Sequence, residues 1–170
     1  ESLKRNERIK NIETEIFGKK ITITGTNVSL SRIEYFNHEN TPKMKIIDAI
    51  MISSRIPILF TKYIYEDFTY VDGGVIDNFP IEQLKTKHIL GIKNKFYISN
   101  QDDTLFTYIS QIINTIKIKL EHKTIDDTSY ILEIDNGDIP IFTYEYIQHI
   151  NTLYMNGYNQ MKEMIKQIKE

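Results

Sequence analysis

Cysteine is absent from the 170-residue sequence, and histidine occurs only four times. Without cysteine the chain can form no disulfide bond, no thiolate zinc site and no cysteine nucleophile. The histidines, which are His38, His88, His122 and His149, stand far apart and lack the short spacing typical of metal ligands. We therefore expect no metal site and no cofactor.

An excess of charge of one sign is also missing. The chain has 21 Lys and Arg against 23 Asp and Glu, and the lysines are dispersed among the acids. Nucleic-acid binding depends on a basic patch, so we expect no nucleic acid as a partner. No run approaches the ~18 uncharged apolar residues of a membrane-spanning helix, and residues 1–5 do not form a signal peptide. The sequence favours a soluble, cytoplasmic protein.

What the chain does have is a regular alternation of helical and strand periodicity. A folded domain of this length buries about 70% of the surface that its unfolded chain exposes, so we expect one domain, or most of one. In the first half of the chain the pattern predicts a helix ending near residues 17–18, strands over 21–24 and 32–37, a helix from 41 to before Pro57, and a connection and strand over 58–71. In the second half it predicts a short helix over 81–85, a strand over 88–92, a core helix over 105–120, a strand over 130–134 and a final helix over about 143–169. This order indicates an α/β sheet covered by helices.

The most informative stretch is 70–81, where an apolar approach runs into an acid and two glycines. Aromatic and β-branched residues predict a strand, and Gly73-Gly74 allow backbone angles closed to other residues. Asp72 is therefore placed where strand becomes loop, and open α/β sheets have their chemistry at such ends. An Asp-Gly-Gly sequence is also an ordinary turn, so the motif alone leaves both interpretations open.

The surroundings favour the first interpretation. Asn78 and Pro80 follow at short offsets, and Ser53-Ser54-Arg55-Ile56-Pro57 lies upstream at the end of an amphipathic helix. Together these segments resemble the patatin-like phospholipase family, whose members carry a serine-rich stretch ending in Ile-Pro, then Asp-Gly-Gly, then Asn-x-Pro. The resemblance implies an α/β fold with a central, mostly parallel sheet flanked by helices. It makes residues 1–170 the C-terminal portion of a single patatin-like domain whose N-terminal third is missing from this chain.

The resemblance also implies a chemistry. Family members use a Ser-Asp dyad, and on this likeness Asp72 is the dyad acid, while Gly73, Gly74, Asn78 and Pro80 support its loop. The Gly-rich oxyanion loop and the Gly-x-Ser-x-Gly elbow of the family do not occur here, so the serine is expected upstream. The implied activity is that of a serine carboxylic-ester hydrolase, a phospholipase A or acylesterase acting on phospholipid or another lipid ester. These 170 residues alone should be inactive.

Ser53, Ser54 and Arg55 are predicted to form a wall of the site. Neither serine lies in the strand-to-helix turn that exposes a catalytic oxygen, so we prefer a packing role to a nucleophile role. Arg55 stands where many relatives have alanine, which makes the wall more cationic. Asp77 is predicted to be a second loop acid with a structural role.

Two questions stay open at this point. Four lysines surround the strand over 88–92, namely Lys85, Lys87, Lys93 and Lys95. They indicate either a solvent-exposed edge or a weak peripheral attraction to anionic lipid headgroups. Because the serine elbow is absent from these residues, the alternative to an enzyme is a non-catalytic α/β module or degenerate relative. Such a module would bind lipid or a protein partner.

Overall fold

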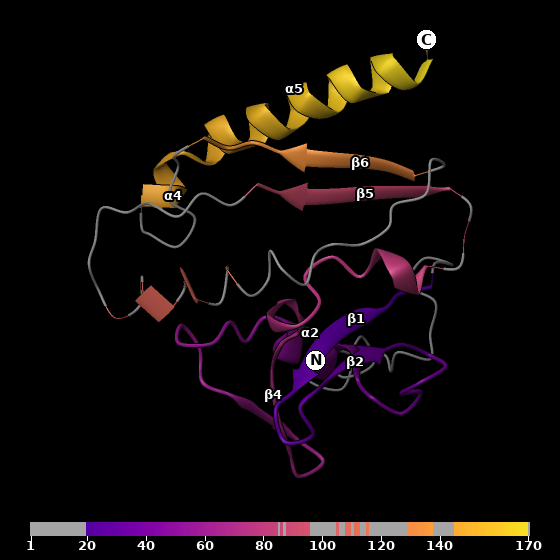
Figure 1. The fold of residues 1–170 in the computed structure, drawn as a ribbon, viewed down its shortest axis with the longest axis vertical. Helices are drawn as coiled ribbons and strands as arrows, with labels where there is room; N and C mark the ends of the chain where they lie inside the picture. The colour runs from indigo at the N-terminus through magenta and orange to yellow at the C-terminus, as the bar shows by residue number, and fades with distance from the viewer. Residues whose placement is uncertain are drawn as a thin grey trace, which may run out of the picture. The chain divides into compact units, whose positions relative to one another are not determined.

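The structure is a computed structural model, which describes residues 20–84, 86, 88–95, 105, 108–109, 111–112, 115, 129–137 and 145–169. The chain divides into two compact units (Figure 1). The N-terminal unit comprises Glu1–Asn78 with Ile113–His122, and the C-terminal unit comprises Phe79–Ile112 with Lys123–Glu170. The predicted helix ending near residues 17–18 and most of the predicted helix over 105–120 lie outside the described residues.

The N-terminal unit contains a four-stranded antiparallel sheet with the strand order β2-β1-β4-β3. Its strands are β1 (Ile23–Asn27), β2 (Arg32–Phe36), β3 (Tyr63–Tyr65) and β4 (Phe68–Asp72). In the register of β1 and β4, Gly25 lies opposite Asp72. The hairpin predicted from residues 21–37 is confirmed, and β1 continues through Gly25 instead of ending there.

The second hairpin, β3–β4, was not predicted, because residues 58–67 resemble a connection. Its two turn residues, Glu66 and Asp67, have φ of 47° and 67°. Two-residue hairpin loops favour such positive angles, since they match the twist of the flanking strands. The available signals were the aromatic alternation of Tyr63-Ile64-Tyr65 and an aspartate at the turn, which tolerates this conformation.

One face of this sheet is covered by α2 (Ile46–Ser53). The buried core consists of Phe36, Met44, Ala49, Ile52 and Tyr70. The rings of Phe36 and Tyr70 meet edge to face at 5.9 Å. A Cβ atom on Gly25 would lie 2.5 Å from Phe36 and 2.6 Å from Ile52, so only glycine fits where the helix approaches β1.

The helix begins later than predicted. Residues 41–45 form a turn in which the Thr41 N–H donates to Asn37 O and the Met44 N–H donates to Thr41 O. Lys45 remains extended, with ψ of 138°, so the first helical residue is Ile46. The predicted start at residue 41 was therefore wrong by several residues, whereas the predicted end before Pro57 is confirmed.

Tyr70 connects the core to a polar network at the edge of the sheet. Its hydroxyl donates to Glu34 Oε2 at 2.9 Å and accepts from Asn27 Nδ2 at 3.1 Å. Arg32 forms an ion pair with Glu34 at 2.8 Å. Burial, together with the hydrogen bond to the Glu34 carboxylate and its charge, raises the pKa of Tyr70 to about 12. Deprotonation of Tyr70 therefore opposes folding.

The C-terminal unit is built on a parallel pair of strands, β5 (Ile89–Asn94) and β6 (Ser129–Ile134). A long helix, α5 (Ile150–Lys169), lies along β6 (Figure 1). The short elements are η2 (Ile81–Gln83), a 3-10 helix where a short helix was predicted, and α4 (Glu145–Gln148). The predicted strands over 88–92 and 130–134 are confirmed, and the final helix is divided by a turn at His149.

Gln160 fixes α5 to the end of β6. Its Oε1 accepts from the Asp135 N–H and its Nε2 donates to Asp135 O, both at 2.9 Å. Gly157 also lies beside β6, but a Cβ there would be 3.8 Å from Ile134 Cδ1, an ordinary contact distance. Alanine would therefore fit at position 157.

The structure is thus a mixed α/β fold, as predicted. Among the described residues the parallel arrangement is found in β5 and β6, whereas the larger sheet is antiparallel because short turns join its hairpins. None of the described helices is both long and apolar enough to cross a membrane.

The packing of α2 on the core predicts that alanine substitutions at two isoleucines of this helix change the free energy of unfolding by different amounts. Ile52 is fully buried and Ile50 is exposed. We expect Ile52→Ala to lower the free energy of unfolding by about 2–5 kcal/mol through the lost contacts and the cavity. Ile50→Ala should change it by only about 0.5 kcal/mol. Urea unfolding of the complete polypeptide measures both, and similar losses would contradict the described packing.

The Tyr70 network predicts a loss of stability at alkaline pH. The pKa is near 10 in the unfolded chain and about 12 in the folded one, so the stabilisation is fully present below pH 10 and is lost as pH rises through 12. The loss should be on the order of 2–3 kcal/mol. Tyr70→Phe cannot titrate, so its unfolding free energy should fall less between pH 10 and 12. Parallel curves for the two proteins would refute this explanation.

Candidate functional site

Asp72 is the last residue of β4 and is held by its backbone from two sides. Its N–H donates to Arg55 O at 3.0 Å, in the segment that follows α2. Its carbonyl accepts from Thr26 Oγ1 of β1 at 2.9 Å. The sheet and the chain after α2 therefore fix the point from which the carboxylate projects, as the sequence suggested.

The carboxylate itself turns back onto the loop that follows it. Asp72 Oδ1 accepts from the Gly74 N–H at 2.6 Å, at the start of the 3-10 turn η1 (Gly73–Val75). A hydrogen bond to an ionised oxygen is short and about twice as strong as one between neutral groups. This bond sets the orientation of the half-buried carboxylate.

Both glycines are buried, and close neighbours explain why each position requires glycine. A Cβ on Gly73 would overlap the side chain and backbone of Thr24. A Cβ on Gly74 would lie 2.7 Å from Asn78 Oδ1 and 2.9 Å from Asp72 Oδ1. A side chain at position 74 would therefore displace the carboxylate.

The remainder of the loop closes on the same turn. Gly73 O accepts from the N–H groups of Ile76 at 3.1 Å and Asp77 at 2.9 Å. Asp77 Oδ2 accepts from the Tyr35 hydroxyl at 2.7 Å, which ties the loop to β2. This bond supports the structural role predicted for Asp77. Tyr35 was missed, because nothing in the alternation of β2 marks it as a partner of a loop 42 residues away.

The two serines lie at the end of α2. Ser53 is the last helical residue, and the Ser54 hydroxyl donates to Met51 O at 3.2 Å. The Ser54 N–H donates to Ile50 O. Ser54 therefore satisfies carbonyls at the end of its own helix.

Arg55 lies directly after this helix end and is half-buried. Its Cζ is 5.7 Å from the centroid of the Tyr63 ring, within the range of a cation-π contact. The Tyr63 hydroxyl donates to Asp48 Oδ1 at 2.8 Å, and this bond raises the pKa of Tyr63. Arg55 Nε is buried, and within the described part of the chain it has no hydrogen-bond partner.

Asn78 and Pro80 complete the predicted motif at the end of the loop. Asn78 is exposed, and its side-chain oxygen lies beside Gly74. Pro80 directly precedes η2 in the C-terminal unit. Between them, Phe79 packs on Gly91 of β5, where a Cβ would lie 2.5 Å from the Phe79 ring.

Two of the four predicted lysines are described, and both pair with acids of the C-terminal unit. Lys93 Nζ lies 3.7 Å from Glu133, and Lys95 Nζ lies 3.2 Å from Asp135. These pairs favour the interpretation as a solvent-exposed edge for Lys93 and Lys95. Lys85 and Lys87 lie outside the described residues.

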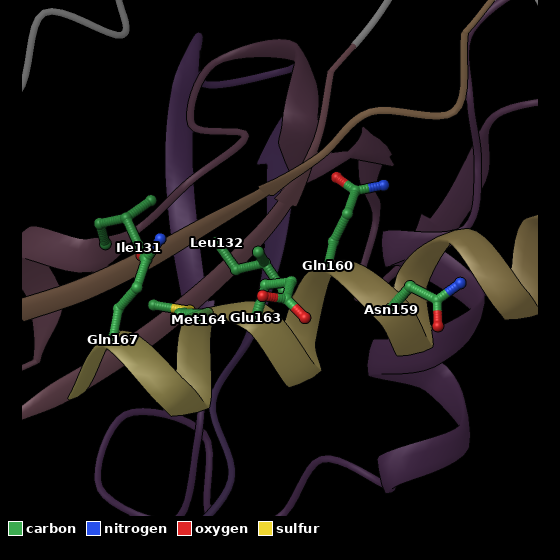
Figure 2. A pocket seen from close by; sticks show the side chains of 7 residues that line it. All are labelled: Ile131, Leu132, Asn159, Gln160, Glu163, Met164 and Gln167. Carbon is green, nitrogen blue, oxygen red and sulfur yellow. The ribbon is translucent and has the colours of Figure 1, made fainter. Parts of the chain in front are cut away.

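The C-terminal unit also has an open groove of about 400 Å³ between β6 and α5. Figure 2 shows Ile131 and Gln167 at one end of it and Asn159 at the other. Its one acid, Glu163, pairs with Lys166 at 2.7 Å. Among the described residues of either unit, no group of three or more His, Asp or Glu side chains could hold a metal ion.

Chemically, the loop after β4 presents a carboxylate in a fixed orientation. Carboxylates offer about four lone-pair positions, and the Gly74 N–H donates to one of the two Asp72 oxygens. A carboxylate within hydrogen-bond reach of a hydroxyl can act as its general base. The arrangement therefore suits proton transfer from a hydroxyl nucleophile.

Comparison with known proteins places this loop in a family. The model of the family described as patatin-like phospholipase matches residues 1–85, half of the chain. The match includes the helix end at 53–55, Asp72 and the Asn-x-Pro segment.

Two viral proteins are similar to parts of the chain. A protein of Invertebrate iridescent virus 6, named "Probable lipid hydrolase", is 38% identical over 65 residues, which are 38% of this chain and 22% of that protein. An uncharacterized protein of Acanthamoeba polyphaga mimivirus is 31% identical over 101 residues, 58% of this chain and 34% of that protein. The matched parts thus span about a fifth to a third of these relatives. With the family match across the β4 loop, they lead to one conclusion: the chain belongs to the patatin-like phospholipase family.

Proposed function

We propose that the complete protein is a lipid acyl hydrolase of the phospholipase A or acylesterase type. The observation that carries the proposal is the Asp72 carboxylate, which stands at the end of β4 and is oriented by the Gly74 N–H at 2.6 Å. This geometry lies within the part of the chain that matches the family. The substrate class is a phospholipid or another lipid ester, reached by peripheral contact with lipid.

In the proposed mechanism Asp72 is the base of a Ser-Asp dyad, and the serine is supplied from residues upstream of this chain. Asp72 accepts the hydroxyl proton as the serine oxygen attacks the ester carbonyl. The tetrahedral intermediate collapses, the proton passes to the departing alcohol, and an acyl-enzyme remains. Water then attacks the acyl-enzyme, Asp72 takes the water proton and returns it to the serine, and the fatty acid leaves. Oxyanion donors would also come from upstream.

The proposal extends to the fold of the complete protein. Residues 1–170 would form the C-terminal portion of one patatin-like domain with a mostly parallel central sheet. The parallel pair β5–β6 supports this arrangement. Without the serine and the oxyanion donors, the 170 residues alone should show no turnover, because general-base catalysis requires the hydroxyl that it activates.

The first test replaces Asp72 by asparagine in the complete protein. Asparagine retains an oxygen that can accept from the Gly74 N–H, so the loop should keep its structure, while the base is lost. We expect hydrolysis of a short-chain nitrophenyl ester to fall by about 10²- to 10⁴-fold. Unfolding by urea should be changed by no more than about 1 kcal/mol.

The matched control is Asp67→Asn, which changes the same residue type in the β3–β4 turn. Asparagine tolerates the positive φ of 67° found there, so both folding and turnover should be preserved. If a folded Asp72→Asn protein hydrolyses the ester as fast as wild type, the dyad assignment is wrong. If the wild type itself has no esterase activity, the non-catalytic lipid-binding or protein-binding module becomes the better description.

A second test addresses the space around the carboxylate. We expect Gly74→Ala to lower ester hydrolysis at least tenfold, because its Cβ would lie 2.9 Å from Asp72 Oδ1 and would push the oxygen out of position. Gly157→Ala is the control, since its Cβ meets nothing closer than 3.8 Å and alanine favours a helix. Initial rates of both proteins measure the effect, and a fully active Gly74→Ala variant would show that the carboxylate orientation does not matter.

A further inference from the structure

The guanidinium of Arg55 is incompletely satisfied by the protein. Among the described residues its buried Nε has no hydrogen-bond partner and Arg55 forms no ion pair. Burying a charged donor without an acceptor is unfavourable unless something else compensates. The arrangement is suited to an acceptor that the described residues do not provide.

Tyr63 contacts this guanidinium without occupying the N–H donors of Arg55. The contact between Arg55 Cζ and the Tyr63 ring, at 5.7 Å, involves the positive charge and the π face, so the N–H groups keep their hydrogen-bonding capacity. Tyr63 is fixed in turn by its hydrogen bond to Asp48 and by pairing with Tyr70 in the sheet. The guanidinium is therefore held by a β3 tyrosine whose own position is fixed by α2 through Asp48.

The guanidinium lies on the side of the sheet that carries the Asp72 side chain. Tyr63 is directly opposite Tyr70, so their side chains share one face, and Asp72 follows Tyr70 by two residues along the same strand. The backbones meet as well, since Arg55 O accepts from the Asp72 N–H at 3.0 Å. Arg55 and Asp72 are therefore neighbours at the end of α2.

We propose that Arg55 is a specificity-determining residue, which binds the phosphate of a lipid ester substrate while Asp72 acts at its ester group. Guanidinium N–H groups match phosphate oxygens in geometry and charge, and the resulting bonds are charge-assisted. The inference rests on the proposed hydrolase function and adds the group that selects phosphate-bearing lipids over neutral lipid esters.

The test compares two substrates that differ only in the phosphate, dihexanoylglycerol phosphate and dihexanoylglycerol. In the complete protein, Arg55→Gln should lower the ratio of kcat/KM for the phosphate substrate to that for the neutral one at least tenfold, mainly through KM. Arg55→Lys retains the charge and should recover part of the preference. Lys62→Gln removes an exposed cation in the same unit and should leave the ratio unchanged.

Different outcomes separate specificity from a structural role. An equal loss on both substrates would mean that Arg55 only supports the fold near Asp72, and an unchanged ratio would also overturn the proposal. Inhibition by inorganic phosphate tests whether Arg55 binds free phosphate. If it inhibits wild type but not Arg55→Gln while the substrate ratio stays the same, the residue binds free phosphate instead of substrate, and the proposal is wrong.

A binding measurement separates this inference from the proposed function. Calorimetric titration of dihexanoylglycerol phosphate into the Asp72→Asn protein needs no turnover, and adding Arg55→Gln should raise Kd at least tenfold. If wild type hydrolyses neither substrate but this shift is found, the hydrolase function fails while phosphate recognition by Arg55 stands. If the shift is absent, recognition by Arg55 is refuted whatever the activity.

Discussion

The hydrogen bond from the Asp72 N–H to Arg55 O is the interaction on which the candidate site depends. It joins the end of β4 to the chain just after α2, so a helix and a strand that are distant in sequence meet at one backbone position. The helix is held there by the buried side chain of Ile52, and it can approach β1 only because residue 25 is glycine. Core packing therefore sets the position of a polar group.

Close packing also requires glycine at two positions of the loop after β4. Gly73 lies against Thr24, and Gly74 lies between Asp72 and Asn78, so the two glycines let the chain turn sharply beneath the carboxylate. The N–H of Gly74 then points at Asp72 Oδ1. A short motif thus supplies the acid, the space around it and the donor that orients it, while Tyr35 holds the far side of the loop through Asp77.

Sequence patterns predicted the parts of this structure that local chemistry decides. Strand character before Asp72 and the glycines after it were sufficient to place the carboxylate at a strand end. The β3 strand was missed because three residues carry little periodicity, and the start of α2 was misplaced because Pro42 fits a turn as well as a helix. Contacts such as Tyr35 with Asp77 or Arg55 with Tyr63 depend on strand register, which no single segment encodes.

The central claim is that Asp72 works with a serine supplied from elsewhere in the protein. Its most direct test combines fluorophosphonate labelling of the complete polypeptide, which identifies the activated serine, with a crystal structure of the unreacted protein. We predict a single labelled serine whose hydroxyl oxygen, in the unreacted protein, lies within about 2.6–3.2 Å of the Asp72 carboxylate or one water molecule away from it. A labelled serine remote from Asp72, or no labelled serine at all, would contradict it.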